Sequence, residues 1–138
     1  MNDMLDFNEK VIKEFRENKG IVGGPFDGAN MLLLTTIGSH TGKLRTTPLV
    51  YLKDGQRYIV IASKGGAPDN PQWFNNIVAL PQVTIEVGTE RIECTAEVMQ
   101  EPERTQLYTR QEEVMPGFVE YRENTDRVIP VIAITPIS

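Results

Sequence analysis

The feature that most constrains the fold is a series of short apolar segments separated by residues that favour tight turns. Asp54-Gly55 and Gly88-Thr89 each lie between two runs of strand-forming residues, a pattern typical of antiparallel hairpins. The predicted strands cover residues 31–36, 46–52, 57–63, 83–87, 91–98 and 128–134. Six strands in this arrangement predict an antiparallel sheet, and closure into a small barrel is the most economical way to bury its apolar face.

The expected helices lie before, between and after these hairpins. They are predicted over residues 4–18, from 70 or 71 to 81, over 102–114 and, as a short helical turn or lid, over 115–124. Asn70 can cap the second helix, with Pro71 at its first position. Strands and helices do not alternate regularly, which argues against a Rossmann fold. The fold class is therefore α+β, a six-stranded antiparallel barrel with flanking helices.

Composition narrows the class of protein. The chain has 138 residues, of which 40% are hydrophobic and 24% charged, as in one globular domain spanning 1–138. Its net charge of −5 argues against nucleic-acid binding. Cys94 and His40 are the single residues of their types, so neither an intrachain disulfide nor an ordinary zinc site is expected. No segment is long and apolar enough to span a membrane, and the acidic N-terminus lacks a signal core, which predicts a cytoplasmic protein.

The N-terminal segment, residues 1–19, carries one apolar helical face. Phe7, Val11 and Phe15 fall four residues apart, so this face could dock on the barrel, touch a membrane surface or join two protomers. The polar face mixes signs, with Glu9 beside Lys10, and this fits poorly with binding to anionic lipid. A location peripheral to the membrane therefore stays open beside a purely cytoplasmic one.

The loop between the first two predicted strands is the first candidate site. Hydroxyls, free amides and cations at close spacing are what a phosphate or carboxylate needs, and the loop is not a P-loop because GxxxxGK[ST] is absent. Its candidate ligands are Ser39, His40, Thr41, Lys43, Arg45 and the amides around Gly38 and Gly42. The alternative is a solvated loop with scattered charge, in which His40 is merely exposed.

The segment after the third predicted strand is the second candidate. Lys64 ends a strand beside Gly65-Gly66, and a helix N-terminus, which attracts anions, follows shortly. Trp73 in the first turn of that helix could cover a ring, although core filling is the commoner role of such a residue. Tyr121 could donate a proton or line a pocket, or belong to an amphipathic lid docked on the barrel. Cys94, in an alternating strand, is expected to pack in the core.

Three stretches resemble a known family. LLLTTIGSHTGKLRTTPLVYLKDG, YIVIASKGGAPDNPQWFNNI and YRENTDRVIPVIAI are similar to the deazaflavin (coenzyme F-420)-dependent nitroreductases over roughly residues 20–136. The resemblance implies a split β-barrel related to FMN-binding oxidoreductases of the pyridoxamine-phosphate oxidase type. It also implies an enzyme in which reduced F-420 gives a hydride to a small-molecule acceptor, a quinone, an enone or a nitro compound.

The resemblance also implies roles for individual residues. Cofactor binding would fall to Ser39, His40, Thr41, Gly42, Lys43, Arg45, Thr46, Thr47, Pro48, Ile61, Ala62, Ser63, Lys64, Trp73 and Asn76. The acceptor pocket would be lined by Met115, Phe118 and Tyr121, with no metal. The proton that follows the hydride could come from Tyr121 or from solvent.

Two departures from the family carry their own expectations. Ser39-His40 stand where the family usually has Arg-Lys, which predicts weaker or more pH-dependent binding of the anionic tail. Met115 and Phe118 replace tyrosines of the pretomanid-activating relatives, which disfavours reduction of bulky nitroimidazoles. Two other functions on the same barrel stay open: an FMN- or FAD-dependent oxidoreductase and a non-catalytic deazaflavin carrier. Barrels of this type are often dimers, so a homodimer stays open as well.

Overall fold

The computed structural model describes residues 3–137 of the chain. Three residues lie outside the described chain: Met1 and Asn2 of the predicted N-terminal segment, and Ser138 at the end of the predicted domain. The side chains of residues 3–6 and 25 are likewise outside the description.

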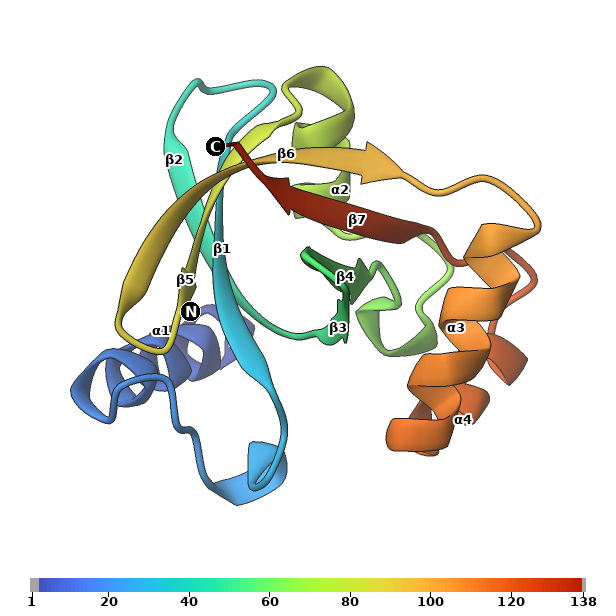
Figure 1. Cartoon of the computed structure of the whole chain (residues 1–138), viewed down its shortest axis with the longest axis horizontal. Coiled ribbons are helices and arrows are strands. Elements are labelled where there is room, and N and C mark those ends of the chain that lie inside the picture. Colours follow the sequence, from blue (N-terminus) through green and yellow to red (C-terminus); the bar gives the residue numbers. More distant parts are fainter. Residues whose placement is uncertain (1–2, 138) are drawn as a thin grey trace.

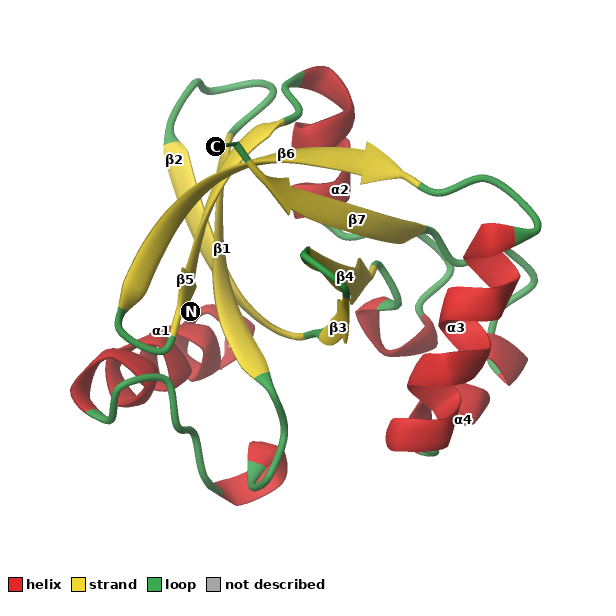
Figure 2. Ribbon diagram, in the orientation of Figure 1, coloured by secondary structure: helices red, strands yellow, loops and turns green. Residues whose placement is uncertain are grey.

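One seven-stranded sheet organises the described chain, and all its pairings are antiparallel. The strands are β1 (Met31–Ile37), β2 (Leu44–Val50), β3 (Leu52–Asp54), β4 (Arg57–Ile61), β5 (Gln82–Val87), β6 (Glu90–Val98) and β7 (Val131–Pro136). Their order is β2-β1-β5-β6-β7-β4-β3, and the sheet curls into a half-barrel (Figures 1 and 2). The predicted α+β class with an antiparallel split barrel is confirmed, with one strand more than the six expected.

The helices lie outside the curl of the sheet or close its open side (Figure 2). They are α1 (Asp3–Glu17), α2 (Gln72–Ala79), α3 (Glu103–Val114) and α4 (Gly117–Glu123), with short 3-10 turns η1 (Gly24–Phe26) and η2 (Lys64–Gly66). None of the helices in the described chain has the length and apolar character needed to cross a membrane.

The extra strand arises within the run 46–52, which the sequence predicts as one strand. The chain changes partner at Tyr51: Pro48 in β2 pairs with Leu33 of β1, whereas Leu52 in β3 pairs with Ile59 of β4. The predicted turn at Asp54-Gly55 is therefore confirmed, but the strand that it joins to β4 is only β3 and not the whole run 46–52. Pro48 lacks an N–H group, which suits a strand at the edge of a sheet, as β2 is.

The change of partner leaves the barrel split along one side. β3 covers only the first three residues of β4, so the chain from Val60 onward has no strand on that side. The outer edge of β2 is free as well. If the pairing between β3 and β4 continued beyond Leu52 into β2, Pro48 would lie opposite Ser63. The loop before β2 and the segment after β4 are the two candidate sites of the sequence, and both therefore border the same opening.

Three apolar clusters hold this architecture. α2 packs Trp73 and Ile77 into the inner cluster of the barrel, while α3 and α4 cover the outer face around Ile59. Of the three roles open for α1, the structure shows docking on the barrel: Val11 and Phe15 are buried against β1. Cys94 is fully buried in the inner cluster, as expected for a packing residue.

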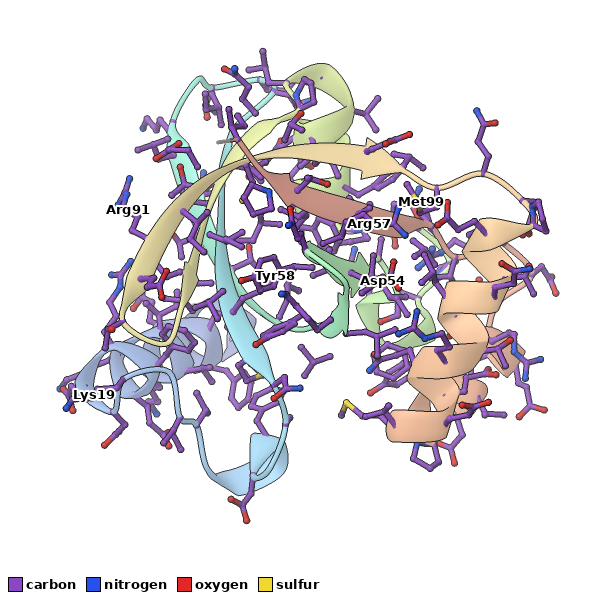
Figure 3. All side chains as sticks on the ribbon, in the orientation of Figure 1. Lys19, Asp54, Arg57, Tyr58, Arg91 and Met99 are labelled. Atoms are coloured by element: carbon purple, nitrogen blue, oxygen red, sulfur yellow. The ribbon has the colours of Figure 1, made fainter. Side chains whose placement is uncertain are left out.

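Charged groups fix α3 to the β3–β4 hairpin. Asp54 accepts hydrogen bonds from Arg57 and, at 2.8 Å, from Arg110 of α3, and these two cations hold the Asp54 pKa below its usual value. Arg57 also lies against the Met99 sulfur at 3.7 Å (Figure 3). α3, which directly precedes the predicted acceptor residues in the chain, is thereby held in place on the sheet.

Two predicted boundaries shift for identifiable reasons. α2 begins at Gln72, with Pro71 at the N-cap position, because the Asn70 side chain accepts a hydrogen bond from Arg127 at 2.8 Å and makes no cap. The last strand begins at Val131, three residues later than predicted. Pro130 precedes it and has no N–H group to contribute to the ladder.

Candidate functional site

The β1–β2 loop is a compact, internally bonded turn. Gly38 N–H donates to the Lys43 carbonyl at 2.7 Å, and Gly42 N–H donates to the Gly38 carbonyl at 2.9 Å. Gly42 has φ +71, a value that favours glycine. The Thr41 hydroxyl accepts from Lys43 N–H at 3.2 Å. Thr41 and Gly42 therefore shape the loop and leave its cationic side chains pointing outward.

Asn76 of α2 holds this loop against the barrel. Its Oδ1 accepts hydrogen bonds from Ser39 N–H at 3.0 Å and from Gln72 Nε2 at 3.1 Å, and its Nδ2 donates to the Thr36 hydroxyl at 3.0 Å. Asn76 and Thr36 are both 1% exposed. With three bonds made inside the protein, Asn76 is suited to position the loop and has little capacity left for a ligand.

Three nitrogen-bearing side chains of the loop are free to meet a ligand. His40, Lys43 and Arg45 are exposed, and none forms a side-chain hydrogen bond or ion pair with another described residue. Most other cations of the chain have carboxylate or carbonyl partners, as Arg57 and Arg104 do. Unpaired cations close together in an acidic protein favour an anionic ligand.

A depression of about 480 Å³ lies beside this loop. It is lined by Leu44, Arg45, Thr46 and Thr47 of β2, by Gln72, Trp73 and Asn76 of α2, and by Asn8, Glu9 and Ile12 of α1. The structure thus brings five of the predicted cofactor residues into one hollow. The wall from α1 was not predicted, because only the docked face of that helix, Val11 and Phe15, shows in the sequence pattern.

The chain at the end of β4 adopts a backbone shape suited to anions. Ser63 is in the right-handed helical region, and Lys64, Gly65 and Gly66 follow at φ +47, +64 and +83. Successive right- and left-handed residues turn neighbouring N–H groups toward one concavity. The N–H groups of Ser63, Lys64 and Gly65 donate to no acceptor in the described residues. They are available to a partly negative oxygen of a ligand.

Lys64 adds a mobile cation to this concavity. Its ammonium contacts both Asp69 carboxylate oxygens at 3.2 Å, and the lysine lowers the Asp69 pKa. Both side chains are well exposed, so the pair contributes little to stability. A ligand carboxylate or phosphate can replace Asp69 at little cost.

Arg127 holds this segment in shape and was missed by the sequence reasoning. Its guanidinium donates to the carbonyls of Ser63, Ala67 and Ala62 at 2.8, 2.9 and 3.2 Å, and to Asn70 Oδ1 at 2.8 Å. None of these acceptors carries charge; the nearby Asp69 carboxylate, whose pKa is lowered by Lys64 and to a lesser extent by Arg127, is the negative group that faces this cation. Its acceptors lie 57 to 65 residues away in sequence, and no local pattern reveals such a contact.

Several other predicted cofactor residues are engaged within the protein. Ile61 and Ala62 are 9% and 0% exposed, with their side chains in the apolar clusters. Thr46 shares a hydrogen bond with Thr35 at 2.8 Å. Trp73 is 6% exposed and belongs to the inner cluster while it lines the depression. Core filling and pocket lining are therefore compatible for Trp73.

The predicted acceptor residues belong to one apolar cluster, in which Phe118 is buried and against which Met115 and Tyr121 pack. The Phe118 carbonyl accepts a hydrogen bond from the Tyr108 hydroxyl at 2.7 Å; burial raises the Tyr108 pKa to about 12. Tyr121 packs edge-on against Phe118, with ring centroids 5.0 Å apart, and stays half-exposed. Met115 also lines a cleft beside the end of α3. α4 is thus docked on the protein, with Tyr121 at its exposed side.

α4 also lies close to the β4 segment. A Cβ added at Gly66 would fall 2.9 Å from the Tyr121 carbonyl and 3.1 Å from Asn124 Cβ. Tyr121 and the turn η2 (Lys64–Gly66) are therefore neighbours, as a common site requires.

Comparison of the chain with known proteins points to one family. A family model described as F420H(2)-dependent quinone reductase matches residues 8–136. A protein of Mycobacterium tuberculosis named F420H(2)-dependent quinone reductase is 38% identical over 125 residues, which cover 88% of this chain and 84% of that protein.

Two solved structures share the fold at substantial identity. One, titled as an F420-H2 dependent reductase, has a TM-score of 0.70 and 35% identity, and the match covers 76% of this chain and 93% of that one. The other, titled as a domain-swapped dimer, has a TM-score of 0.72 and 29% identity, with coverage of 96% and 97%.

Proposed function

The chain belongs to the F420H(2)-dependent quinone reductase family, and from this premise we propose that it transfers a hydride from reduced coenzyme F-420 to a quinone. Enones and nitro compounds are further acceptors of the same chemical kind. The observation that carries the proposal is the set of unpaired donors along the split of the barrel. His40, Lys43 and Arg45 lie at one part of it, and the free N–H groups from Ser63 to Gly65 border another.

These donors fit an anionic deazaflavin cofactor. F-420 carries a phosphodiester and a glutamate tail, and the protein as a whole is acidic, with a net charge of −5. Only a local group of cations can overcome that repulsion, and Lys43 and Arg45 supply it. Each charge-assisted hydrogen bond to such a ligand contributes about 1.5–3 kcal/mol when it is partly desolvated.

The protein's part in the reaction is to orient, to exclude water and to deliver a proton. When bound, the reduced deazaflavin supplies the hydride at its C5. A quinone that takes up one hydride and one proton becomes a hydroquinone. Tyr121, beside the turn η2, is the proton donor we assign to the chain, and solvent is the alternative. Asn76 and Arg127 hold the two binding segments in the shapes that the ligand meets.

The test is a titration of the purified protein with reduced F-420, reduced FMN and NADPH, followed by ligand fluorescence, with menadione then added to each mixture. We expect selective binding of F-420 and its oxidation by menadione. Binding of FMN alone would contradict the proposal and favour the flavin-dependent alternative. Binding of F-420 without oxidation by menadione or a wider set of acceptors would mean a deazaflavin carrier.

A matched pair of variants tests which cations bind the cofactor. Lys43→Met together with Arg45→Met removes two unpaired cations of the loop, whereas Arg91→Met removes an exposed cation on β6 that points away from the barrel (Figure 3). The double variant is expected to raise the Kd for F-420 by at least tenfold at low salt, and the control to leave it unchanged. Equal effects of the two would remove the loop from the binding site.

We also propose that the chain can form a homodimer. The split barrel leaves β2 and β3 as free edges, and a relative that aligns over 96% of this chain is described as a domain-swapped dimer. Light scattering after size exclusion, over a range of protein concentrations, tests this. A single monomeric mass at every concentration would contradict it.

A further inference from the structure

A second cleft lies at the other end of β2 from the cationic loop. Its volume is about 190 Å³, and it opens between the chain at 27–30 and the C-terminal end of α3. Val50 and Tyr51 form its floor, five and six residues beyond Arg45. At about 3.3 Å per residue, Val50 lies roughly 17 Å along the strand from Arg45. The cleft is therefore distinct from the depression beside the loop.

The walls of this cleft are fixed by hydrogen bonds. Tyr51 N–H donates to the Asn30 carbonyl at 3.0 Å, which ties the 27–30 segment to the joint between β2 and β3. Met115 N–H donates to the Gln111 carbonyl at 2.8 Å and closes the end of α3. The hollow is thus built into the fold.

Gln111 is the polar group of the cleft that the fold leaves unexplained. It is 3% exposed, and its side-chain amide makes no hydrogen bond to any described residue. Every side-chain N or O atom sealed from solvent in the described part of the chain does have a partner. The small exposed area of Gln111 must therefore lie at its amide, which faces the cleft it lines. The amide is therefore open to the cleft, and a ligand with a hydrogen-bond acceptor can bond to it there.

The chemistry of the cleft favours a neutral ligand. No lysine, arginine or histidine lines it, and the Asp27 carboxylate stands at its rim, so an anion would be repelled. Val50, Met115 and the Tyr51 ring supply apolar surface. A flat apolar ring with a carbonyl group meets both conditions, because the carbonyl can accept a hydrogen bond from Gln111 Nε2.

We propose that this cleft binds the ring of the quinone acceptor, with Gln111 Nε2 donating to one quinone carbonyl. The proposal rests on the proposed function and adds to it a place and a recognition residue for the acceptor. Tyr121 is not among the residues that line this cleft, so a proton from Tyr121 would reach the quinone through water. Met115, one of the residues that the family resemblance assigns to the acceptor, lies in the cleft wall. Val114 is 64% exposed at its mouth and offers an apolar exit for a quinone side chain.

The binding test uses menadione and the protein without cofactor. Side-chain amide resonances of uniformly ¹⁵N-labelled protein are followed during a menadione titration, and Gln111 is assigned by its loss in Gln111→Met. Methionine keeps an unbranched side chain of similar length and removes the amide. Gln106→Met, an exposed glutamine on the same helix, is the matched control.

We expect the Gln111 resonances to shift saturably, and the menadione Kd to rise about 2- to 13-fold in Gln111→Met, the range for loss of one neutral hydrogen bond. The Kd for F-420 and the behaviour of Gln106→Met should stay as in the wild type. If Gln111 does not shift, or if its loss leaves the menadione Kd unchanged while the wild type still oxidises reduced F-420, the inference is overturned and the proposed function stands. If Gln111 shifts but reduced F-420 is never oxidised, the cleft is supported and the proposed function fails.

Discussion

Replacement of Arg127 should show whether the segment after β4 depends on a single side chain. The guanidinium makes four hydrogen bonds, to three backbone carbonyls and to Asn70. Hydrogen bonds to charged groups contribute about 1.5–3 kcal/mol each. Because the four bonds share one half-buried group and water replaces part of them, we count about two, or roughly 3–6 kcal/mol in Arg127→Met.

Urea unfolding followed by fluorescence of the single tryptophan, Trp73, measures this loss. Trp73 is buried beside the affected segment. With an m-value of about 2 kcal/mol/M, the unfolding midpoint should fall by roughly 2 M. Arg127→Lys keeps the charge but cannot reach all four acceptors, so its midpoint should lie between those of the wild type and Arg127→Met.

Cofactor binding gives a second, independent measurement. Without Arg127 the Ala67 carbonyl loses its partner and the Ser63 carbonyl keeps only Gly66 N–H, and the adjacent N–H groups lose the arrangement that we propose receives the ligand. The Kd for F-420 should therefore rise at least tenfold in Arg127→Met under conditions in which the variant is folded. Arg91→Met controls for the loss of a positive charge. If Arg127→Met has the same urea midpoint and the same Kd for F-420 as Arg91→Met, the reasoning is refuted.

Three further predictions concern α4 and the start of α3. Gly66→Ala should destabilise the fold by about 1–3 kcal/mol more than Gly65→Ala in thermal melts, because both glycines have positive φ but only Gly66 abuts α4; equal losses would mean that α4 is not held there. Tyr121→Phe should cut menadione turnover and leave the F-420 Kd unchanged, and unchanged turnover would remove Tyr121 as the proton donor. Thr105 lowers the Glu101 pKa from 4.5 to about 2, so the stability this carboxylate contributes is present above pH 4.5 and lost as the pH falls toward 2. Glu101→Gln should therefore flatten the acid limb of a urea-midpoint profile in that window, and an unchanged limb would contradict the assignment.

The parts of the fold that the sequence predicted are those fixed by local chemistry. The Asp54-Gly55 and Gly88-Thr89 turns need only their own residues, and both join antiparallel strands as expected. The break at Tyr51 could not be predicted, because residues 49–52 include no glycine, proline, asparagine or aspartate that would mark a turn. It depends on whether the chain pairs with β1 or β4, which is decided by contacts distant in sequence. Pro48 was the one local indication, since it suits only an edge strand.

The candidate site divides in the same way. The loop from Ser39 to Arg45 could be found because its cations and glycines are contiguous in sequence. The residues that hold it, or that hold the segment after β4, could not be assigned those roles: Asn76 was expected to touch the ligand, and Arg127 was not singled out. Both act through hydrogen bonds to segments 37 to 65 residues away. Gln111 lies in a helix with almost no amphipathic pattern, so its sequence context does not reveal that it is buried.

The positions of the two hollows on β2 suggest why the barrel is split. A closed barrel would pair the free edge of β2 with the end of β4 and satisfy its backbone groups internally. Here β3 turns aside after three residues, and the N–H groups beyond β4 stay available. Cations at Lys43 and Arg45 then favour an anion at one end of β2, while the cleft at Gln111, beside the Asp27 carboxylate, favours a neutral ring at the other. A cofactor held by its anionic part at the first end can reach an acceptor held at the second only by lying along the split.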